Sequence, residues 1–170
     1  MVYIENGNID SSLLIMLEVA KWLTEKGEPL WKIEDLTKEK LLEDNITSDN
    51  FYTCWENDEP IATMILQWHY PKFWKNIRSG ETGFIRKLCV SRKYAGKGIS
   101  YKMMEFAENE CKRKNINYLR LDCAGDRQKL CKFYESLGYT QINKKIIGEY
   151  NIAFYEKYID KKATTTHNKR

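Results

Sequence analysis

Apolar residues recur along the chain at two spacings, which predict two kinds of element. Residues three and four apart predict helices at about 10–26, 37–43, 99–114 and 128–137, because this spacing gathers apolar side chains on one helical face. Gly27 and Gly138 end two of these helices in the way glycine commonly does. Alternating or short apolar runs predict strands at 2–5, 51–56, 61–68, 84–90, 118–123, 139–143 and 152–157.

The order of these elements predicts the fold class. Asn57 to Pro60 indicate a hairpin between two strands, whereas the strand–helix–strand segment at 84–123 requires a parallel pair with a right-handed crossover. We therefore expect a mixed α/β (α+β) central sheet with helices on both faces. Residues 1–160 are predicted to form one domain, and 161–170 a basic, disordered tail.

The excess positive charge is confined to that tail. The chain has 28 basic and 24 acidic residues, and 161–170 contain four basic residues and no acid. The body is therefore neutral, whereas a nucleic-acid partner requires a basic stripe on the folded part. We expect no nucleic-acid partner.

The cysteines and the terminus favour a cytoplasmic protein. Five cysteines form an odd set without a C-x-x-C pair, which predicts reduced thiols and no zinc site. His69 and His167 lie near no cysteine pair, so no metal is expected. The N-terminal residues show no signal-peptide pattern, and no apolar run is long enough to span a membrane. We expect a cytoplasmic protein without a membrane partner, as a monomer or homodimer.

Residues 88–100, L-C-V-S-R-K-Y-A-G-K-G-I-S, carry the first candidate site. A strand ends at Val90, Gly96 and Gly98 follow, and a helix begins near Ile99. Glycine allows a close backbone approach, and the start of a helix presents free N–H groups to an anion such as a pyrophosphate. The alternative is a turn that uses glycine for geometry alone, because a glycine pair by itself is a weak signal.

Two segments together resemble the GNAT superfamily of N-acetyltransferases. Residues 84–100, F-I-R-K-L-C-V-S-R-K-Y-A-G-K-G-I-S, resemble its acetyl-CoA loop. Residues 119–139, L-R-L-D-C-A-G-D-R-Q-K-L-C-K-F-Y-E-S-L-G-Y, are similar to its later strand and helix, which end in a tyrosine followed by x-x-x-G-F/Y. The element order over about 1–158 agrees as well.

The resemblance implies that strands 84–90 and 118–123 splay apart to hold acetyl-CoA. Backbone groups of Leu88, Cys89 and Val90 would pair with its pantetheine. The N–H groups from Ala95 to Ser100 would bind its pyrophosphate. The implied cofactor-binding residues are Leu88, Cys89, Val90, Lys93, Ala95, Gly96, Lys97, Gly98, Ile99 and Ser100.

The same resemblance implies that Tyr134 lies near the cofactor sulfur. An amine would attack the thioester directly, and a tyrosine is a suitable general acid for the leaving thiolate. A strand N–H near Leu88 would stabilise the oxyanion. The alternative for Tyr134 is an aromatic that only packs in the core. Cysteine nucleophile chemistry is not expected, because no histidine is paired with a cysteine.

The sequence departs from the commonest family pattern at several positions. Lys93 replaces Arg or Gln, Ala95 replaces a second Arg, and Arg127 stands where Asn is frequent. The slot of the family's usual glutamate falls at Phe84. The general base is therefore open between Glu81, His69, Asp122 and water.

The acceptor is an amine that the sequence does not identify. Aromatic residues gather in two regions expected to border it, where they could form a π-rich pocket for a cationic amine or simply pack. They are Trp22 and Trp31, and Trp68, His69, Tyr70, Phe73 and Trp74. Glu28, Glu34 and Asp35 could favour such a cation. The competing hypotheses are a non-catalytic acyl-CoA-binding module and a nucleic-acid-associated protein that uses the tail.

Overall fold

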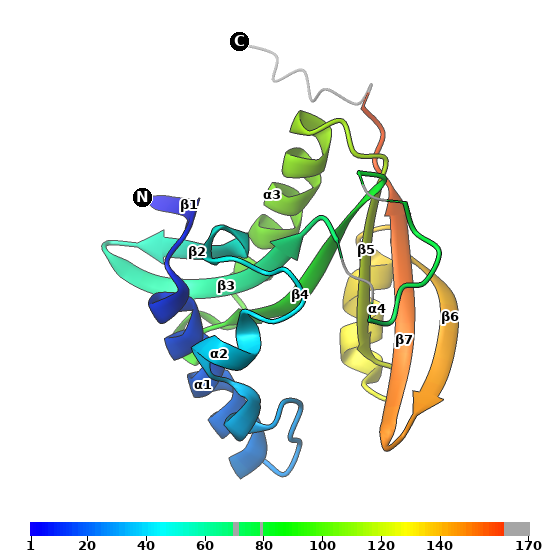
Figure 1. Cartoon of the computed structure of the whole chain (residues 1–170). Helices are drawn as coiled ribbons and strands as arrows, with labels where there is room; N and C mark the ends of the chain where they lie inside the picture. Colours follow the sequence, from blue (N-terminus) through cyan, green and yellow to red (C-terminus); the bar gives the residue numbers. More distant parts are fainter. Residues whose placement is uncertain (70–71, 79, 162–170) are drawn as a thin grey trace.

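The computed structural model describes residues 1–69, 72–78 and 80–161 (Figure 1). The tail from residue 162 and Tyr70 lie outside these residues. Seven strands form one sheet in the order β1-β2-β3-β4-β5-β7-β6. They are β1 (Val2–Asn6), β2 (Phe51–Glu56), β3 (Glu59–Gln67), β4 (Thr82–Val90), β5 (Tyr118–Ala124), β6 (Thr140–Ile147) and β7 (Tyr150–Tyr158).

The predicted mixed sheet is confirmed, because β4 and β5 pair in parallel and the other neighbouring strands pair antiparallel. The helices are α1 (Ile9–Glu25), α2 (Lys38–Leu41), α3 (Ile99–Arg113) and α4 (Gln128–Ser136), with a short 3-10 turn, η1 (Ile33–Asp35), before α2.

Local sequence explains where two of the helices begin. Asn8 caps α1 by accepting a hydrogen bond from the Ser11 N–H at 3.0 Å, so the helix begins at Ile9, close to the predicted start near residue 10. Thr37 caps α2, which ends at Leu41 rather than near residue 43 as predicted.

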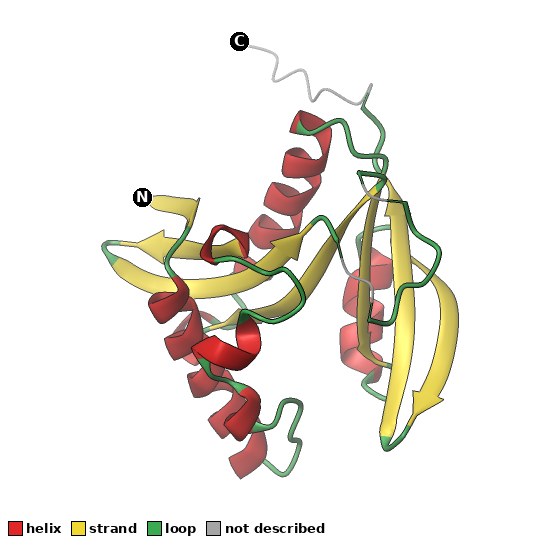
Figure 2. Ribbon diagram, in the orientation of Figure 1, coloured by secondary structure: helices red, strands yellow, loops and turns green. Residues whose placement is uncertain are grey.

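Helices cover both faces of the sheet (Figure 2). Neighbouring residues of β2 point to opposite faces, as the pleat of a strand requires. Phe51 packs with Ile15 and Met16 of α1, whereas Tyr52 packs with Met103 of α3. Burial of each such apolar side chain contributes about 1.5–3 kcal/mol to folding. The two helices therefore hold β2 to β4 between them.

The parallel contact between β4 and β5 is short. It runs from Thr82 opposite Tyr118 to Ile85 opposite Leu121 and then ends. Beyond it, β4 stays paired with β3 as far as Val90, and β5 stays paired with β7 as far as Ala124. The strands thus diverge into the gap visible between their ribbons in Figure 1, which we call the splay.

A β-bulge in β4 lies where the splay begins. The register between β3 and β4 shifts between Thr63 and Ile65, and Lys87 adopts a left-handed backbone with φ of 50°. A bulge bends its strand and increases the local twist. Because it follows the last residue of β4 that pairs with β5, it accounts for the divergence of the two strands.

Candidate active site

The unpaired end of β4 forms one wall of the splay. Leu88 and Val90 pack on the cluster beneath α3, whereas the Cys89 side chain is buried on the α1 face. Past Ile85 no described residue of β5 pairs with this stretch. Its backbone can therefore pair with an extended ligand, as the family resemblance implies for Leu88, Cys89 and Val90.

The glycine turn (residues 91–98) joins β4 to α3. Gly96 and Gly98 have left-handed φ values of 75° and 76°, and a Cβ built on either would meet no atom within 4 Å. The turn is therefore open above both glycines. Gly98 precedes the first residue of α3 without a side-chain cap, so the N–H groups of Ile99 and Ser100 point into the turn. This is the geometry of an anion site.

One predicted donor in the glycine turn is already used. The Ala95 N–H donates to the Arg92 carbonyl at 3.2 Å. The amides that remain for a phosphate run from Gly96 to Ser100.

The basic side chains beside the glycine turn contact other parts of the protein. Lys93 forms an ion pair with Glu59, with 2.9 Å between Nζ and Oε2. Lys97 Nζ lies 5.0 Å from the centre of the Tyr94 ring. Arg92 stacks on Trp22 at 3.6 Å. The fixed part of the anion site is therefore its backbone.

Tyr134 of α4 is buried, with 6% of its surface exposed. Its hydroxyl has no hydrogen-bond partner among the described residues. Burial raises its pKa, and smaller contributions come from Cys123 and Asp122 of β5 and from Cys89 of β4. These groups belong to both diverging strands, so Tyr134 lies close to both walls of the splay.

Asp122 lies on the β5 side of the splay. Its Oδ2 accepts a hydrogen bond from Trp74 Nε1 at 3.2 Å. Burial raises the pKa of this carboxyl, although the Trp74 bond and the charges of Arg86 and Lys87 oppose the shift. A carboxyl shifted towards neutral pH is suited to exchange a proton.

The other two candidate bases lie elsewhere. Glu81 accepts a hydrogen bond from the Arg78 N–H within its own turn, before β4 begins. His69 is exposed, and its carbonyl accepts a hydrogen bond from the Gln67 side chain. Of the three carboxylate and imidazole candidates, the structure brings Asp122 alone to the splay.

The sequence reasoning missed Lys87, which lies at the bulge between the two walls. Burial and, to a smaller extent, the neighbouring charge of Arg86 lower the pKa of its ammonium to about 8. Its Nζ lies 4.9 Å from the centre of the Trp31 ring. The signal available was two adjacent basic residues inside the apolar strand F-I-R-K-L-C-V.

Comparison with known proteins agrees with this geometry. The model of the acetyltransferase (GNAT) family matches residues 16–139, which include the splay, the glycine turn and Tyr134. The chain belongs to the acetyltransferase (GNAT) family.

Relatives of this GNAT protein share most of its length. The uncharacterised N-acetyltransferase YesJ of Bacillus subtilis is 26% identical over 137 residues, which cover 74% of this chain and 72% of that protein. A GNAT-family acetyltransferase from Listeria monocytogenes has a TM-score of 0.73 at 20% identity, covering 92% of this chain and 94% of that one.

A second similar structure was solved with ligands. N-acetylglutamate synthase from Neisseria gonorrhoeae, complexed with coenzyme A and N-acetyl-glutamate, has a TM-score of 0.67 at 13% identity. The match covers 94% of this GNAT chain but 35% of that one. At these identities the solved structures show a common fold.

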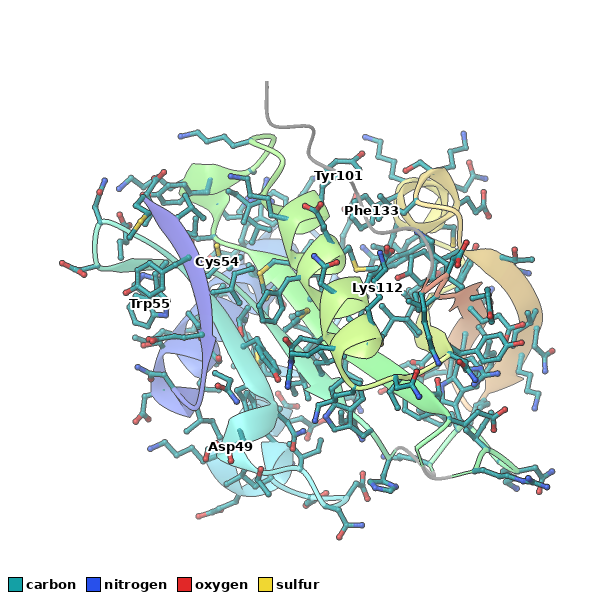
Figure 3. All side chains as sticks on the ribbon, turned by 90° about the horizontal axis from the view of Figure 1, so that it is seen from above. Asp49, Cys54, Trp55, Tyr101, Lys112 and Phe133 are labelled. Atoms are coloured by element: carbon teal, nitrogen blue, oxygen red, sulfur yellow. The ribbon has the colours of Figure 1, made fainter. Side chains whose placement is uncertain are left out.

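Arg127, which replaces the frequent family asparagine, bridges two parts of this GNAT fold. Its Nη2 donates to the carbonyls of Glu28 at 3.0 Å and Pro29 at 2.9 Å. The loop after α1 is thereby tied to the start of α4. On the other face, the rings of Tyr101 in α3 and Phe133 in α4 meet edge to face at 5.1 Å (Figure 3).

The cysteines are free thiols, as predicted. Cys54, Cys89 and Cys111 are buried, and the nearest pair, Cys123 and Cys131, has its sulfurs 4.0 Å apart. Burial raises the pKa of Cys54 to about 11 and that of Cys111 to about 12. These two thiols are thus unreactive at neutral pH.

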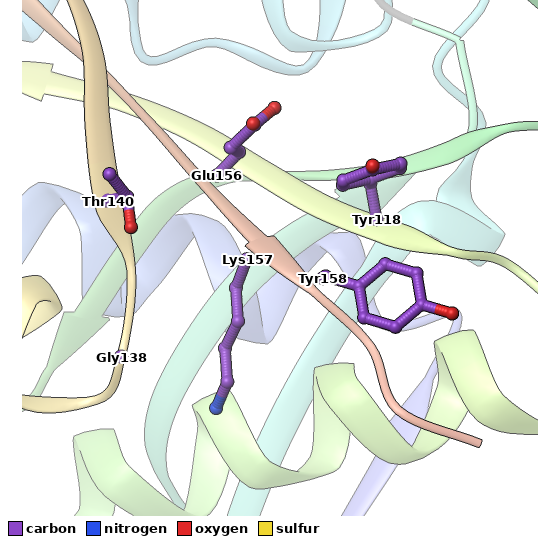
Figure 4. A pocket seen from close by; sticks show the side chains of 6 residues that line it. All are labelled: Tyr118, Gly138, Thr140, Glu156, Lys157 and Tyr158. Atoms are coloured by element: carbon purple, nitrogen blue, oxygen red, sulfur yellow. The ribbon is translucent and has the colours of Figure 1, made fainter. Parts of the chain in front are cut away.

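A hollow lies at the opposite end of β5 from the splay (Figure 4). It is lined by Tyr118, Gly138, Thr140, Glu156, Lys157 and Tyr158. Its lysine is bound to Glu108 of α3 at 2.9 Å. The hollow contains none of the residues at the splay or the glycine turn.

Within residues 1–69, 72–78 and 80–161, no cluster of three or more His, Cys, Asp or Glu residues could hold a metal ion. No helix in the same ranges is long and apolar enough to cross a membrane.

Proposed function

We propose that this protein transfers the acetyl group of acetyl-CoA to a primary amine in the cytoplasm. The observation that supports this most strongly is the position of Tyr134 beside the diverging strands β4 and β5. Of these, β4 leads through the glycine turn into the uncapped start of α3. The splay offers unpaired backbone to a pantetheine, and the glycine turn offers N–H groups to a pyrophosphate. A tyrosine at their junction would meet the thioester sulfur.

In the proposed reaction Tyr134 acts as the general acid. Burial keeps its hydroxyl protonated at neutral pH, so it can donate a hydrogen bond or its proton to the leaving CoA thiolate. Strand N–H groups near Leu88 would stabilise the oxyanion that forms during attack by the amine.

Asp122 is the proposed general base. It lies across the splay from β4 and is held by the Trp74 hydrogen bond. Its raised pKa brings it closer to the operating pH, where a carboxylate can accept the proton that the attacking ammonium must lose. Phe84, which occupies the slot of the family's usual glutamate, is buried against Trp74 and cannot do this.

The test is release of CoA thiol from acetyl-CoA in the presence of a panel of primary amines. We expect turnover by the wild type and a decrease in kcat of about 100-fold or more in Tyr134→Phe, as removal of a general acid typically causes. The affinity for acetyl-CoA should stay the same in both. Tight binding of acetyl-CoA without turnover of any amine would instead identify a non-catalytic acyl-CoA-binding module.

A further inference from the structure

The aromatic residues near the acceptor side are already occupied by the protein's own cations. Trp31 contacts Lys87 at 4.9 Å, and Trp22 contacts Arg92 at 3.6 Å and Lys26 at 5.0 Å. A cationic acceptor would have to displace them to reach these rings. The structure thus disfavours the π-rich pocket for a cation that the sequence left open.

The nearby acids are also engaged. Asp35 forms an ion pair with Lys40 at 2.6 Å, and Glu28 lies 3.6 Å from Lys26 and 3.8 Å from Arg127. The acids expected to attract a cation therefore have partners outside the splay, with Glu34 left exposed.

Lys87, in contrast to these acids, forms no ion pair with a described residue. No carboxylate oxygen of the described residues lies within 4.0 Å of its Nζ. Its side chain is half-buried, and its Nζ lies 4.9 Å from the centre of the Trp31 ring. Asp122 and Asp35 act on its charge from beyond ion-pair distance, so an anionic ligand that reaches its Nζ would gain a charge-assisted hydrogen bond.

The backbone at Lys87 is itself unusual. A left-handed φ of 50° is uncommon for a residue other than glycine, and such conformations gather at functional sites. The charges of Arg86 and Lys87 both lie near enough to Asp122 to lower the pKa of its carboxyl. One carboxyl and two cations thus face the same part of the splay.

We propose that the acceptor is a primary amine that also carries an anionic group, a carboxylate or a phosphate, which Lys87 binds while Asp122 receives the amine. The proposal rests on the proposed function and narrows its substrate class. The Trp31 ring holds the Lys87 ammonium in position. The adjacent Arg86 guanidinium, which donates a hydrogen bond to Gln67 at 3.4 Å, adds positive potential. Recognition of both ends would orient the amine for attack.

The experiment compares acceptors matched in their amine but not in their charge. The pairs are methionine with methioninamide, and O-phosphoethanolamine with ethanolamine, in wild type, Lys87→Met and Lys87→Arg. We expect the anionic member of at least one pair to have a kcat/KM about 10-fold or more higher in the wild type, the size of one charge-assisted hydrogen bond. The pair that shows this distinguishes carboxylate from phosphate.

Lys87→Met should remove the preference, mainly by raising the KM of the anionic member, and Lys87→Arg, which keeps a positive charge near Asp122, should retain most of it. Equal use of both members by the wild type, or an equal loss for both in Lys87→Met, would overturn the proposal while leaving acetyl transfer intact. No CoA release with any amine would count against the proposed function.

If no amine causes release of CoA, a binding measurement can still test the anion site. Calorimetry of N-acetylmethionine and of O-phosphoethanolamine with the protein–CoA complex requires no turnover. Binding of either that is weakened about 10-fold in Lys87→Met would support the anion site, again by the energy of one charged hydrogen bond. Binding of neither, or binding that is unchanged in Lys87→Met, would overturn it.

Discussion

On the donor side of the splay the groups available to a ligand are mainly backbone groups, whereas on the acceptor side they are side chains. The glycine turn and the end of β4 come from one continuous segment, residues 88–100. The acceptor side combines Trp31 after α1, Trp74 before β4, Lys87 in β4 and Asp122 in β5. One side is local in sequence and the other is assembled by the fold.

This difference has a physical consequence for substitution. A backbone site depends on the conformation of the chain, so a single residue that blocks the turn should abolish binding. In a side-chain site some residues bind the substrate and others transfer a proton. A substitution of the first kind should therefore change mainly KM, and one of the second kind mainly kcat.

The largest effect is expected at the glycine turn. Gly96→Glu places a bulky negative charge beside the predicted phosphate position, and we expect the Kd for acetyl-CoA to rise about 100-fold or more, since charge repulsion at an anion site costs several kcal/mol. Calorimetric titration with acetyl-CoA measures this directly.

Gly96→Asn is the matched control. Asparagine tolerates the left-handed φ of 75° at this position and adds no charge. Its Kd for acetyl-CoA should stay within about threefold of the wild-type value, because an uncharged side chain at residue 96 points into open space. Equal affinities of Gly96→Glu and wild type would show that the phosphate binds elsewhere.

The next effect is expected at Asp122. Asp122→Asn keeps the shape of the side chain and removes the base, so kcat should fall about 100-fold, at the lower end of the range for general base catalysis. The Kd for acetyl-CoA should not change. Steady-state rates with a saturating amine measure the loss, and an unchanged kcat would favour water as the base.

The element order, the parallel pair and the glycine turn could be predicted, because each depends on local spacing, whereas the place of Tyr134 was implied by the family resemblance. The bulge at Lys87 could not, since it results from the register between β3 and β4. The contact between Lys87 and Trp31 joins residues far apart in the chain. The choice of Asp122 over Glu81 required knowing where the parallel pairing ends.

A smaller effect is expected from pH. The Lys87 ammonium should lose its charge as pH rises through about 8, so the preference for an anionic acceptor should decline above that pH. The groups that face it are Arg86 and Cys89 of β4, Asp122 of β5 and Asp35 of η1. Among these, the Cys89 thiol stays neutral because burial raises its pKa.

Lys87→Arg separates this effect from ionisation of the acceptor amine. Its guanidinium stays charged over the whole range, so the ratio of kcat/KM for the anionic and neutral acceptors should fall above pH 8 in the wild type relative to the variant. If this ratio depends on pH in the same way in both proteins, the anionic acceptor is bound by a charge other than that of Lys87.

The smallest effect is expected at Lys93. Its ammonium is paired with Glu59 and exposed, so Lys93→Ala should change the Kd for acetyl-CoA by less than about threefold, as expected for a surface charge. A loss as large as that in Gly96→Glu would mean that side chains rather than backbone hold the pyrophosphate.

The most direct test of the donor site is a crystal structure with coenzyme A bound. We predict that its pantetheine lies between β4 and β5 along Leu88 to Val90, that its pyrophosphate contacts the amides of Gly96 to Ser100, and that its sulfur lies within hydrogen-bond distance of the Tyr134 hydroxyl. Coenzyme A bound outside the splay, or with its sulfur away from Tyr134, would contradict the account.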